Sequence, residues 1–187
     1  MTSTCLLVTS YATRELTQFD ADGIELRRVH LPDYITPQHA VESPTGTFII
    51  SHYIRQSDQN AISEVDTYKL SVTSTRLLVM SEYIRQDKDQ VDQDHISDEL
   101  CQFTSSLVVD SKGNVLMADY ENCCILLLDS RLSLRCVIID EHQLNQRKPL
   151  RLCYMEQSGQ LLVGSNLSDV ALYDVLRHSS DCLTGIT

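Results

Sequence analysis

Histidine is the residue type in this chain best suited to acid–base or metal chemistry, and the sequence contains six of them. A neutral imidazole can take up a proton near neutral pH or bind a metal ion. The histidines show no spacing typical of a ligand set, and His52 has no partner acid or nucleophile beside it in the sequence. No phosphate-binding glycine loop and no nucleophile elbow are present. The sequence therefore predicts no catalytic residue, no metal site and no cofactor.

The densest group of carboxylates lies in an insertion at residues 86–100. Carboxylate oxygens are the ligands that calcium prefers, so a calcium site is one interpretation of this stretch. The stretch lacks the central glycine and the final glutamate of an EF-hand loop. A solvated acidic insertion is the simpler interpretation.

Aromatic and polar residues at or just beyond the ends of four apolar runs could bind a partner. The candidates for a binding face are Tyr11, Arg14, Tyr53, Arg55, Tyr120, Glu121 and Asn166. Tyr11, Tyr53 and Tyr120 occupy matching positions, and large aromatic side chains are favoured in protein interfaces. They form either an aromatic rim for peptide recognition or caps that pack on adjacent turns.

These candidates are positioned by a phrase that occurs four times in the sequence. Each copy is a short apolar run that ends in small or polar residues, followed later by an apolar residue and an aspartate. The runs are Leu6–Tyr11, Phe48–Tyr53, Val115–Tyr120 and Leu161–Asn166, and the later pairs are Phe19–Asp20, Val65–Asp66, Leu128–Asp129 and Tyr173–Asp174. One position near the end of the run varies (Ser10, His52, Asp119, Ser165), which argues against one shared catalytic residue.

The third copy shows the strand pattern most clearly. Strand-like segments at residues 105–110, 115–118, 123–129 and 134–139 are separated by short turns. Four strands per copy, at intervals of roughly 40 residues, are typical of propeller blades. We therefore expect an all-β chain that forms a propeller-like array of four-stranded antiparallel blades. A β-sandwich is the alternative, although it gives no reason for strands and turns to repeat in phase.

The whole chain, residues 1–187, is predicted to form one propeller segment. Its blades are expected near residues 5–32, 37–82, 103–140 and 149–176, with the acidic insertion between the second and third. The last strand of the second blade is expected at residues 76–81. Two copies are complete and two are partial, which is too few to close a ring. We therefore expect a fragment of a larger propeller, or a ring completed by another chain, and self-association through open sheet faces.

Charge and composition restrict the expected partners and location. The net charge of −11, from 15 basic and 26 acidic residues, suits a protein partner better than RNA, since phosphate binding needs clustered cations. No apolar stretch is long enough to cross a membrane, and the chain does not begin with a signal-like segment. The seven cysteines include no C-x-x-C pair. We expect reduced, structural thiols in a cytoplasmic protein.

The segment Ser106–Tyr120 resembles the NHL repeat of six-bladed β-propellers. In that repeat a strand ending in aspartate is followed by Gly-Asn, an apolar strand and an Ala-Asp step, which correspond here to Asp110, Gly113–Asn114 and Ala118–Asp119. The resemblance implies a non-enzymatic scaffold that presents blade loops to a protein partner. The substrate-recognition part of tripartite-motif ubiquitin ligases is one such scaffold.

Two alternatives remain open. One is a propeller enzyme of the hydrolase or lactonase type, with a metal in the central channel held by residues of several first strands. The expected first strands, at residues 38–42, 104–107 and 151–154, lack carboxylates at matching positions. The other alternative is an NHL domain that binds single-stranded RNA on its loops.

Overall fold

The predicted all-β, propeller-like array is confirmed by the computed structural model, which describes residues 5–56, 59–66, 71–77 and 106–175. The strands are β1 (Leu6–Ser10), β2 (Glu15–Phe19), β3 (Glu25–His30), β4 (Ile35–Glu42), β5 (Phe48–Ile54), β6 (Gln59–Asp66), β7 (Ser71–Leu77), β8 (Leu107–Val109), β9 (Val115–Asp119), β10 (Cys124–Leu128), β11 (Leu134–Ile139), β12 (Pro149–Met155), β13 (Gln160–Ser165) and β14 (Val170–Asp174).

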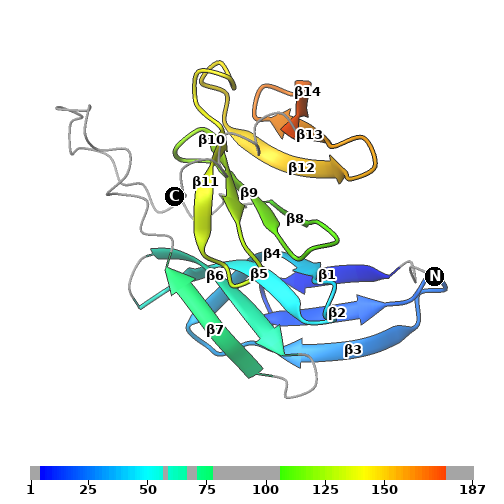
Figure 1. Cartoon of the computed structure of the whole chain (residues 1–187). Helices are drawn as coiled ribbons and strands as arrows, with labels where there is room; N and C mark the ends of the chain where they lie inside the picture. The colour runs from blue at the N-terminus through cyan, green and yellow to red at the C-terminus, as the bar shows by residue number, and fades with distance from the viewer. Residues whose placement is uncertain (1–4, 57–58, 67–70, 78–105, 176–187) are drawn as a thin grey trace.

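These strands form four antiparallel sheets that follow one another along the chain. Sheet 1 contains β1–β3, sheet 2 contains β4–β7, sheet 3 contains β8–β11 and sheet 4 contains β12–β14. Every strand pairs with its neighbour in sequence, so each sheet is a simple meander. Successive sheets contact one another through β1, β4, β8 and β12. Sheets 1 and 4 therefore lie at the two ends of the array, apart from each other (Figure 1).

Burial distinguishes the two middle sheets from the two end sheets. The central strand β9 is buried along its whole length, because Val115 and Met117 pack toward sheet 2 while Leu116 and Ala118 pack toward sheet 4. Strand β14 instead alternates between exposed and half-buried residues. An antiparallel sheet with one covered face gives this alternation, whereas a sheet covered on both faces gives a continuous apolar run.

Aspartates close the turns at the end of the strands opposite the candidate binding residues. Asp20 accepts hydrogen bonds from the backbone N–H groups of Asp22 and Ile24, and Asp129 does the same for Arg131 and Ser133. Short carboxylate side chains stabilise such turns by bonding to the backbone two residues on. The repeated aspartate of the sequence phrase has this structural role in sheets 1 and 3.

Local differences from the sequence prediction have identifiable causes. The fourth strand of sheet 2 was expected at residues 76–81, but β7 begins at Ser71. Cys123 was expected to start a strand, yet it lies in the β9–β10 turn with a φ of 51°. A left-handed residue of this kind ends strand pairing locally. The remainder of the expected strand and the insertion at residues 86–100 lie outside the described residues.

The cysteines depart from the expectation in one respect. Cys5, Cys123, Cys124 and Cys153 form no disulfide, but Cys136 is disulfide-bonded. The expectation of reduced thiols throughout is therefore wrong at Cys136. Burial raises the pKa of the Cys124 thiol to about 12, which leaves it protonated and unreactive. Within the described ranges, no helix is long and apolar enough to cross a membrane.

Candidate functional site

All seven candidate binding residues lie at one end of the sheets. Because the strands are antiparallel, the connections β1–β2, β5–β6, β9–β10 and β13–β14 share this end with β3–β4 and β11–β12. We call this end the loop face. It consists of residues 11–14, 31–34, 55–56, 120–123, 140–148 and 166–169 in the described part of the chain.

Three of the candidates gather around one lysine that the sequence analysis did not single out. The ammonium of Lys148 lies 4.5 Å from the centroid of the Tyr120 ring and 3.8 Å from Oε2 of Glu121. The backbone N–H of Lys148 donates to Oδ1 of Asn166, and the N–H of Asn166 donates to the carbonyl of Lys148. This Lys148 cluster therefore joins the loops of sheets 3 and 4, and the cation sits over the aromatic ring as cation–π pairs do.

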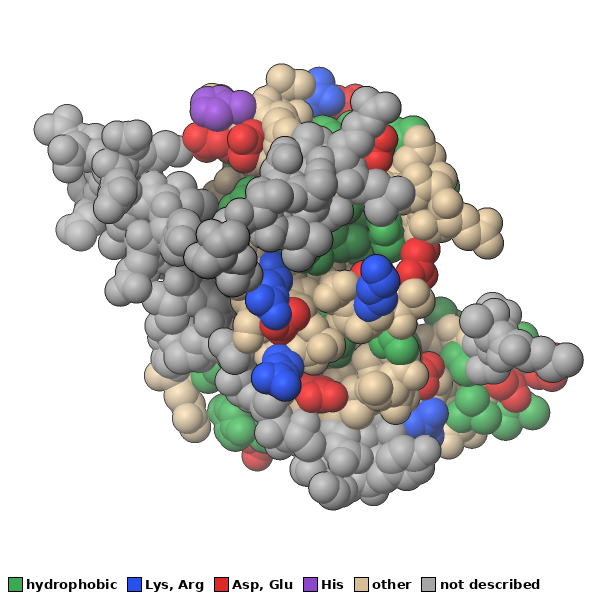
Figure 2. Space-filling model, in the orientation of Figure 1, with side chains coloured by type: hydrophobic (Ala, Val, Ile, Leu, Met, Phe, Trp, Pro, Cys, Tyr) green, Lys and Arg blue, Asp and Glu red, His purple; other side chains and the backbone are tan. Residues whose placement is uncertain are grey.

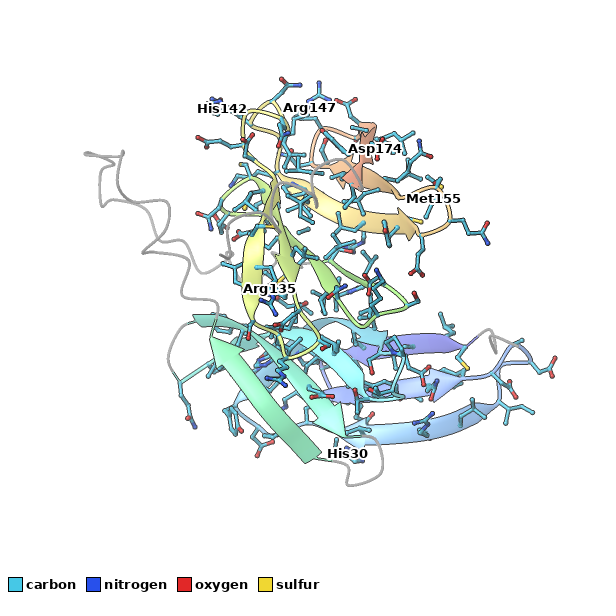
Figure 3. The ribbon with its side chains drawn as sticks, in the orientation of Figure 1. His30, Arg135, His142, Arg147, Met155 and Asp174 are labelled. Carbon is cyan, nitrogen blue, oxygen red and sulfur yellow. The ribbon has the colours of Figure 1, made fainter. Side chains whose placement is uncertain are left out.

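A second ion pair lies beside the Lys148 cluster. Nη1 of Arg147 is 2.8 Å from Oδ2 of Asp169, and both side chains are well exposed. Arg147 and His142 project from the β11–β12 connection near sheet 4 (Figure 3). Where the surface in view is coloured, blue basic and red acidic side chains lie close to one another (Figure 2). The two ion pairs give the loop face around sheets 3 and 4 groups of both signs.

Two other candidates fix the connection between sheets 1 and 2. Nη1 of Arg14 donates to the carbonyl of Asp33 over 2.8 Å, and the backbone of Arg14 accepts from Leu31. Arg55 bonds the same connection from the other side, since its N–H donates to the carbonyl of Tyr34. Its Nε also donates to Oγ1 of Thr36 over 3.0 Å. Both arginines therefore hold a loop in place, and Tyr34 stays 40% exposed on it.

The three tyrosines of the expected rim occupy different environments. Tyr11 follows β1 directly and is 56% exposed. Tyr120 follows β9 and is half-buried beneath Lys148. Tyr53 lies inside β5, which continues to Ile54, and is half-buried. The rim is thus uneven, with Tyr11 the most available of the three for contact, and its binding role stays a prediction.

His52, considered as a catalytic base, lies in the interior of sheet 2. Its side chain is fully buried, and its Nε2 is 2.7 Å from Oγ of the buried Ser63. Its Nδ1 is buried without a hydrogen-bond partner among the described residues. Burial lowers the pKa of His52 to about 4. A neutral imidazole sealed from solvent has no access to a substrate, so the pair is structural.

The first strands use their side chains to join sheets. Nδ1 of His39 accepts a hydrogen bond from the N–H of Leu107 in the next sheet, and Oγ of Ser106 accepts one from Leu152. Burial, and secondarily the charge of Arg151, lowers the pKa of His39, which keeps it a neutral acceptor. Among the described residues, no group of three His, Cys, Asp or Glu side chains could hold a metal ion.

The residues that sequence reasoning missed lie in the connections between sheets. Lys148, Arg147 and Tyr34 belong to the β11–β12 and β3–β4 connections, in which the sequence pattern marked no candidate residue. The Lys-Pro step that ends one of these segments could have drawn attention to Lys148, because the residue before a proline is extended and opens the next strand.

Comparison with known proteins bears on the fold alone. No protein-family model and no curated protein matches the chain. Among solved structures, hydrazine synthase from Kuenenia stuttgartiensis is similar with a TM-score of 0.51 and 10% identity, over 91% of this chain and 68% of that one. Virginiamycin B lyase from Staphylococcus aureus is similar with a TM-score of 0.49 and 11% identity, over 93% of this chain and 54% of that one.

The Dos1 propeller is a third similar structure, with a TM-score of 0.49 and 15% identity, over 92% of this chain and 39% of that one. This chain therefore spans little more than half of the lyase and less than half of the Dos1 propeller. These proteins include enzymes as well as a protein described only by its fold. At such identities the likeness concerns the arrangement of strands and not activity.

Proposed function

We propose that the protein is a non-enzymatic interaction module that binds a protein partner on its loop face. The observation that carries the proposal is the way the loops are held. Lys148 and Asn166 bond each other's backbone across two loops, and Arg14 and Arg55 clamp the connection that presents Tyr34. Loops fixed on a rigid scaffold lose little entropy when a partner binds, which favours recognition.

The side chains that these loops present suit a polypeptide. Tyr11 and Tyr34 are exposed, and so is Arg147. Tyrosine and arginine are both favoured at protein interfaces. Polypeptides carry charges of both signs as well as apolar groups. The mixed charge of the loop face can complement the charges, and its exposed tyrosines can contact the apolar groups. Recognition of a ubiquitin-ligase substrate is the specific form of this function that the NHL resemblance suggests.

RNA fits the loop face less well than protein. Arg14, Arg147 and Lys148 are each within ion-pair distance of a carboxylate, on Asp33, Asp169 and Glu121 respectively. Affinity for RNA comes largely from protein cations that neutralise phosphates and so release the counterions condensed on the RNA. Cations already paired with carboxylates neutralise fewer phosphates. The enzyme alternative is also less favoured, since His39 and Ser106 use their acceptor atoms to join sheets.

The proposal retains a cytoplasmic location as its expectation. The disulfide at Cys136 argues in the other direction, because disulfides persist mainly in oxidising compartments. Binding on the loop face does not depend on this point, since the bonds that hold the loops do not involve Cys136.

The test is site-specific photo-crosslinking in cells of the parent organism. A photoreactive amino acid in place of Tyr11, on the loop face, is expected to capture a defined protein partner. The control places the same amino acid at Ile24, which is 61% exposed in the β2–β3 turn at the opposite end of the sheets. Both positions are accessible, so a difference in crosslinking between them depends on where each residue lies and not on its exposure.

A partner captured at position 11 and not at position 24 supports the proposal. In that case, Tyr11→Ala is expected to weaken the complex by about 1–3 kcal/mol, the range of an aromatic contact at an interface. Equal capture at both positions, or capture of RNA in place of protein at position 11, would refute the binding of a protein on the loop face.

A further inference from the structure

Each internal interface between sheets uses the same two sets of register positions. The first set is a row across one sheet, such as Val108, Leu116 and Leu127 in sheet 3, which lie opposite one another on β8, β9 and β10. This row packs in one apolar cluster with Leu161 and Val163 of sheet 4. We call the row the outgoing row and the residues that meet it the receiving pair.

The interface between sheets 2 and 3 uses the same register positions, except that Glu64 lies opposite Ile49 where Leu127 lies opposite Leu116 in sheet 3. Val41 and Ile49 lie opposite each other in the outgoing row of sheet 2. They pack in one cluster with Val115 and Met117, the receiving pair of sheet 3. The interface between sheets 1 and 2 follows the same rule, since Leu7 packs in the cluster that contains the receiving pair of sheet 2.

The receiving pair always lies two and four positions before the variable residue of the repeated run. In sheet 1 that residue is Ser10, so the receiving pair consists of Leu6 and Val8. No described sheet precedes sheet 1, and Leu6 and Val8 are 62% and 40% exposed. An apolar pair that is buried in every other sheet is therefore open at this end of the array.

The outgoing row is open at the other end. Cys153, Leu162 and Leu172 lie opposite one another across β12, β13 and β14, in the register of the buried row of sheet 3. Cys153 is exposed, Leu162 is half-buried and Leu172 is 53% exposed. Val170, on the same face, is 70% exposed. At each of the three internal interfaces, an outgoing row packs on a receiving pair. At the two ends of the array, one receiving pair and one outgoing row are therefore exposed.

Arg151 occupies the register position at which His39 and Ser106 accept a backbone N–H from the next sheet. Its Nη1 donates to the carbonyl of Leu150 within the same strand, so the apolar positions alone carry the match between the two ends.

We propose that the outgoing row of sheet 4 packs on the receiving pair of sheet 1 in a second copy of this chain. Two copies related by a two-fold axis form this contact twice and expose neither end. The assembly contains eight sheets, within the range of about four to eight blades over which propellers close. It repeats an interface that this sequence already forms, and it is independent of the loop face.

The test is the mass of the purified chain, measured by light scattering after size exclusion, together with variants of each end. The wild-type protein is expected at twice its 21.2 kDa. Val8→Glu and Leu172→Lys, each alone, place charges in both contacts and are expected to weaken the dimer by about 100-fold or more. An equimolar mixture of the two variants restores a dimer, because one of its two contacts contains only native residues.

Ile24→Lys is the control, since Ile24 is 61% exposed and lies on neither end face, and it is expected to remain dimeric. Melting curves followed by circular dichroism show whether each variant is folded. A wild-type mass of one chain overturns the proposal and assigns the open ends to further sheets or to another protein. A ladder of larger masses overturns ring closure, and a failure of the mixture to dimerise overturns head-to-tail pairing.

Discussion

Ile50→Ala is expected to reduce the free energy of unfolding by about 2–5 kcal/mol, the range for truncating a fully buried isoleucine. Ile50 is 0% exposed and belongs to the apolar cluster between sheets 1 and 2. The truncation removes a residue of the receiving pair and leaves a cavity between two sheets that cannot easily collapse together. Because domains of this kind are stable by about 5–15 kcal/mol, the variant would lose much of its stability. Urea titration followed by circular dichroism measures the loss.

The matched control is Ile24→Ala, which removes the same atoms from a side chain that is 61% exposed. Its effect is expected to stay within about 0.5 kcal/mol. Similar losses for the two variants would mean that the face of sheet 2 toward sheet 1 is not packed as described.

His52 is expected to make the protein sensitive to acid. Burial lowers its folded-state pKa from 6.5 to about 4, so the folded protein takes up this proton only at lower pH than the unfolded chain does. The stability that neutral His52 contributes is fully present above pH 6.5 and is lost as the pH falls through 4. Over that window the loss amounts to about 3 kcal/mol for this one group. Urea titrations at a series of pH values measure it.

The variant that tests this assignment is His52→Gln, which retains polar atoms near Ser63 but does not titrate in this range. Its free energy of unfolding is expected to fall less steeply between pH 6.5 and 4 than that of the wild type. An unchanged slope in His52→Gln would contradict the role of His52.

The register of the repeated phrase could be predicted from the sequence because it depends on local patterns. Short apolar runs, followed by turns with aspartate or glycine, define strands such as β9 and β13 without knowledge of the partner sheets. The start of β7 was placed too late. Residues 71–75 are polar or β-branched, without the apolar run that marks the other strands. They pair with β6 through a bulge, which cannot be predicted from the local sequence pattern.

The chemistry of the candidate residues could be predicted less well than the fold. The sequence places Tyr120 and Asn166 at matching positions, but it does not show that Lys148 joins them, because that contact depends on the path of the β11–β12 connection. The place of His52 near the end of its apolar run suggested that its side chain was accessible, whereas the continuation of β5 to Ile54 places it inside the sheet. Contacts between loops of different sheets require the tertiary structure.

The variable position of the run illustrates how one structural role uses different side chains. Asp119 accepts from the N–H and the side-chain amide of Asn122 and so closes the β9–β10 turn. Oγ of Ser165 accepts from Leu167 in the corresponding turn of sheet 4. The turn is thus preserved with fewer hydrogen bonds, which explains why the phrase tolerates substitution here.

Hydrogen–deuterium exchange of the chain, with and without the partner identified by crosslinking, measures directly whether the loop face binds a protein. Exchange is expected to slow in residues 11–14, 31–34, 120–123 and 166–169 when the partner is bound. No change is expected in the turns at residues 20–24, 43–47 and 110–114, at the opposite end of the sheets. Protection confined to those turns, or to the end faces of sheets 1 and 4, would contradict binding on the loop face.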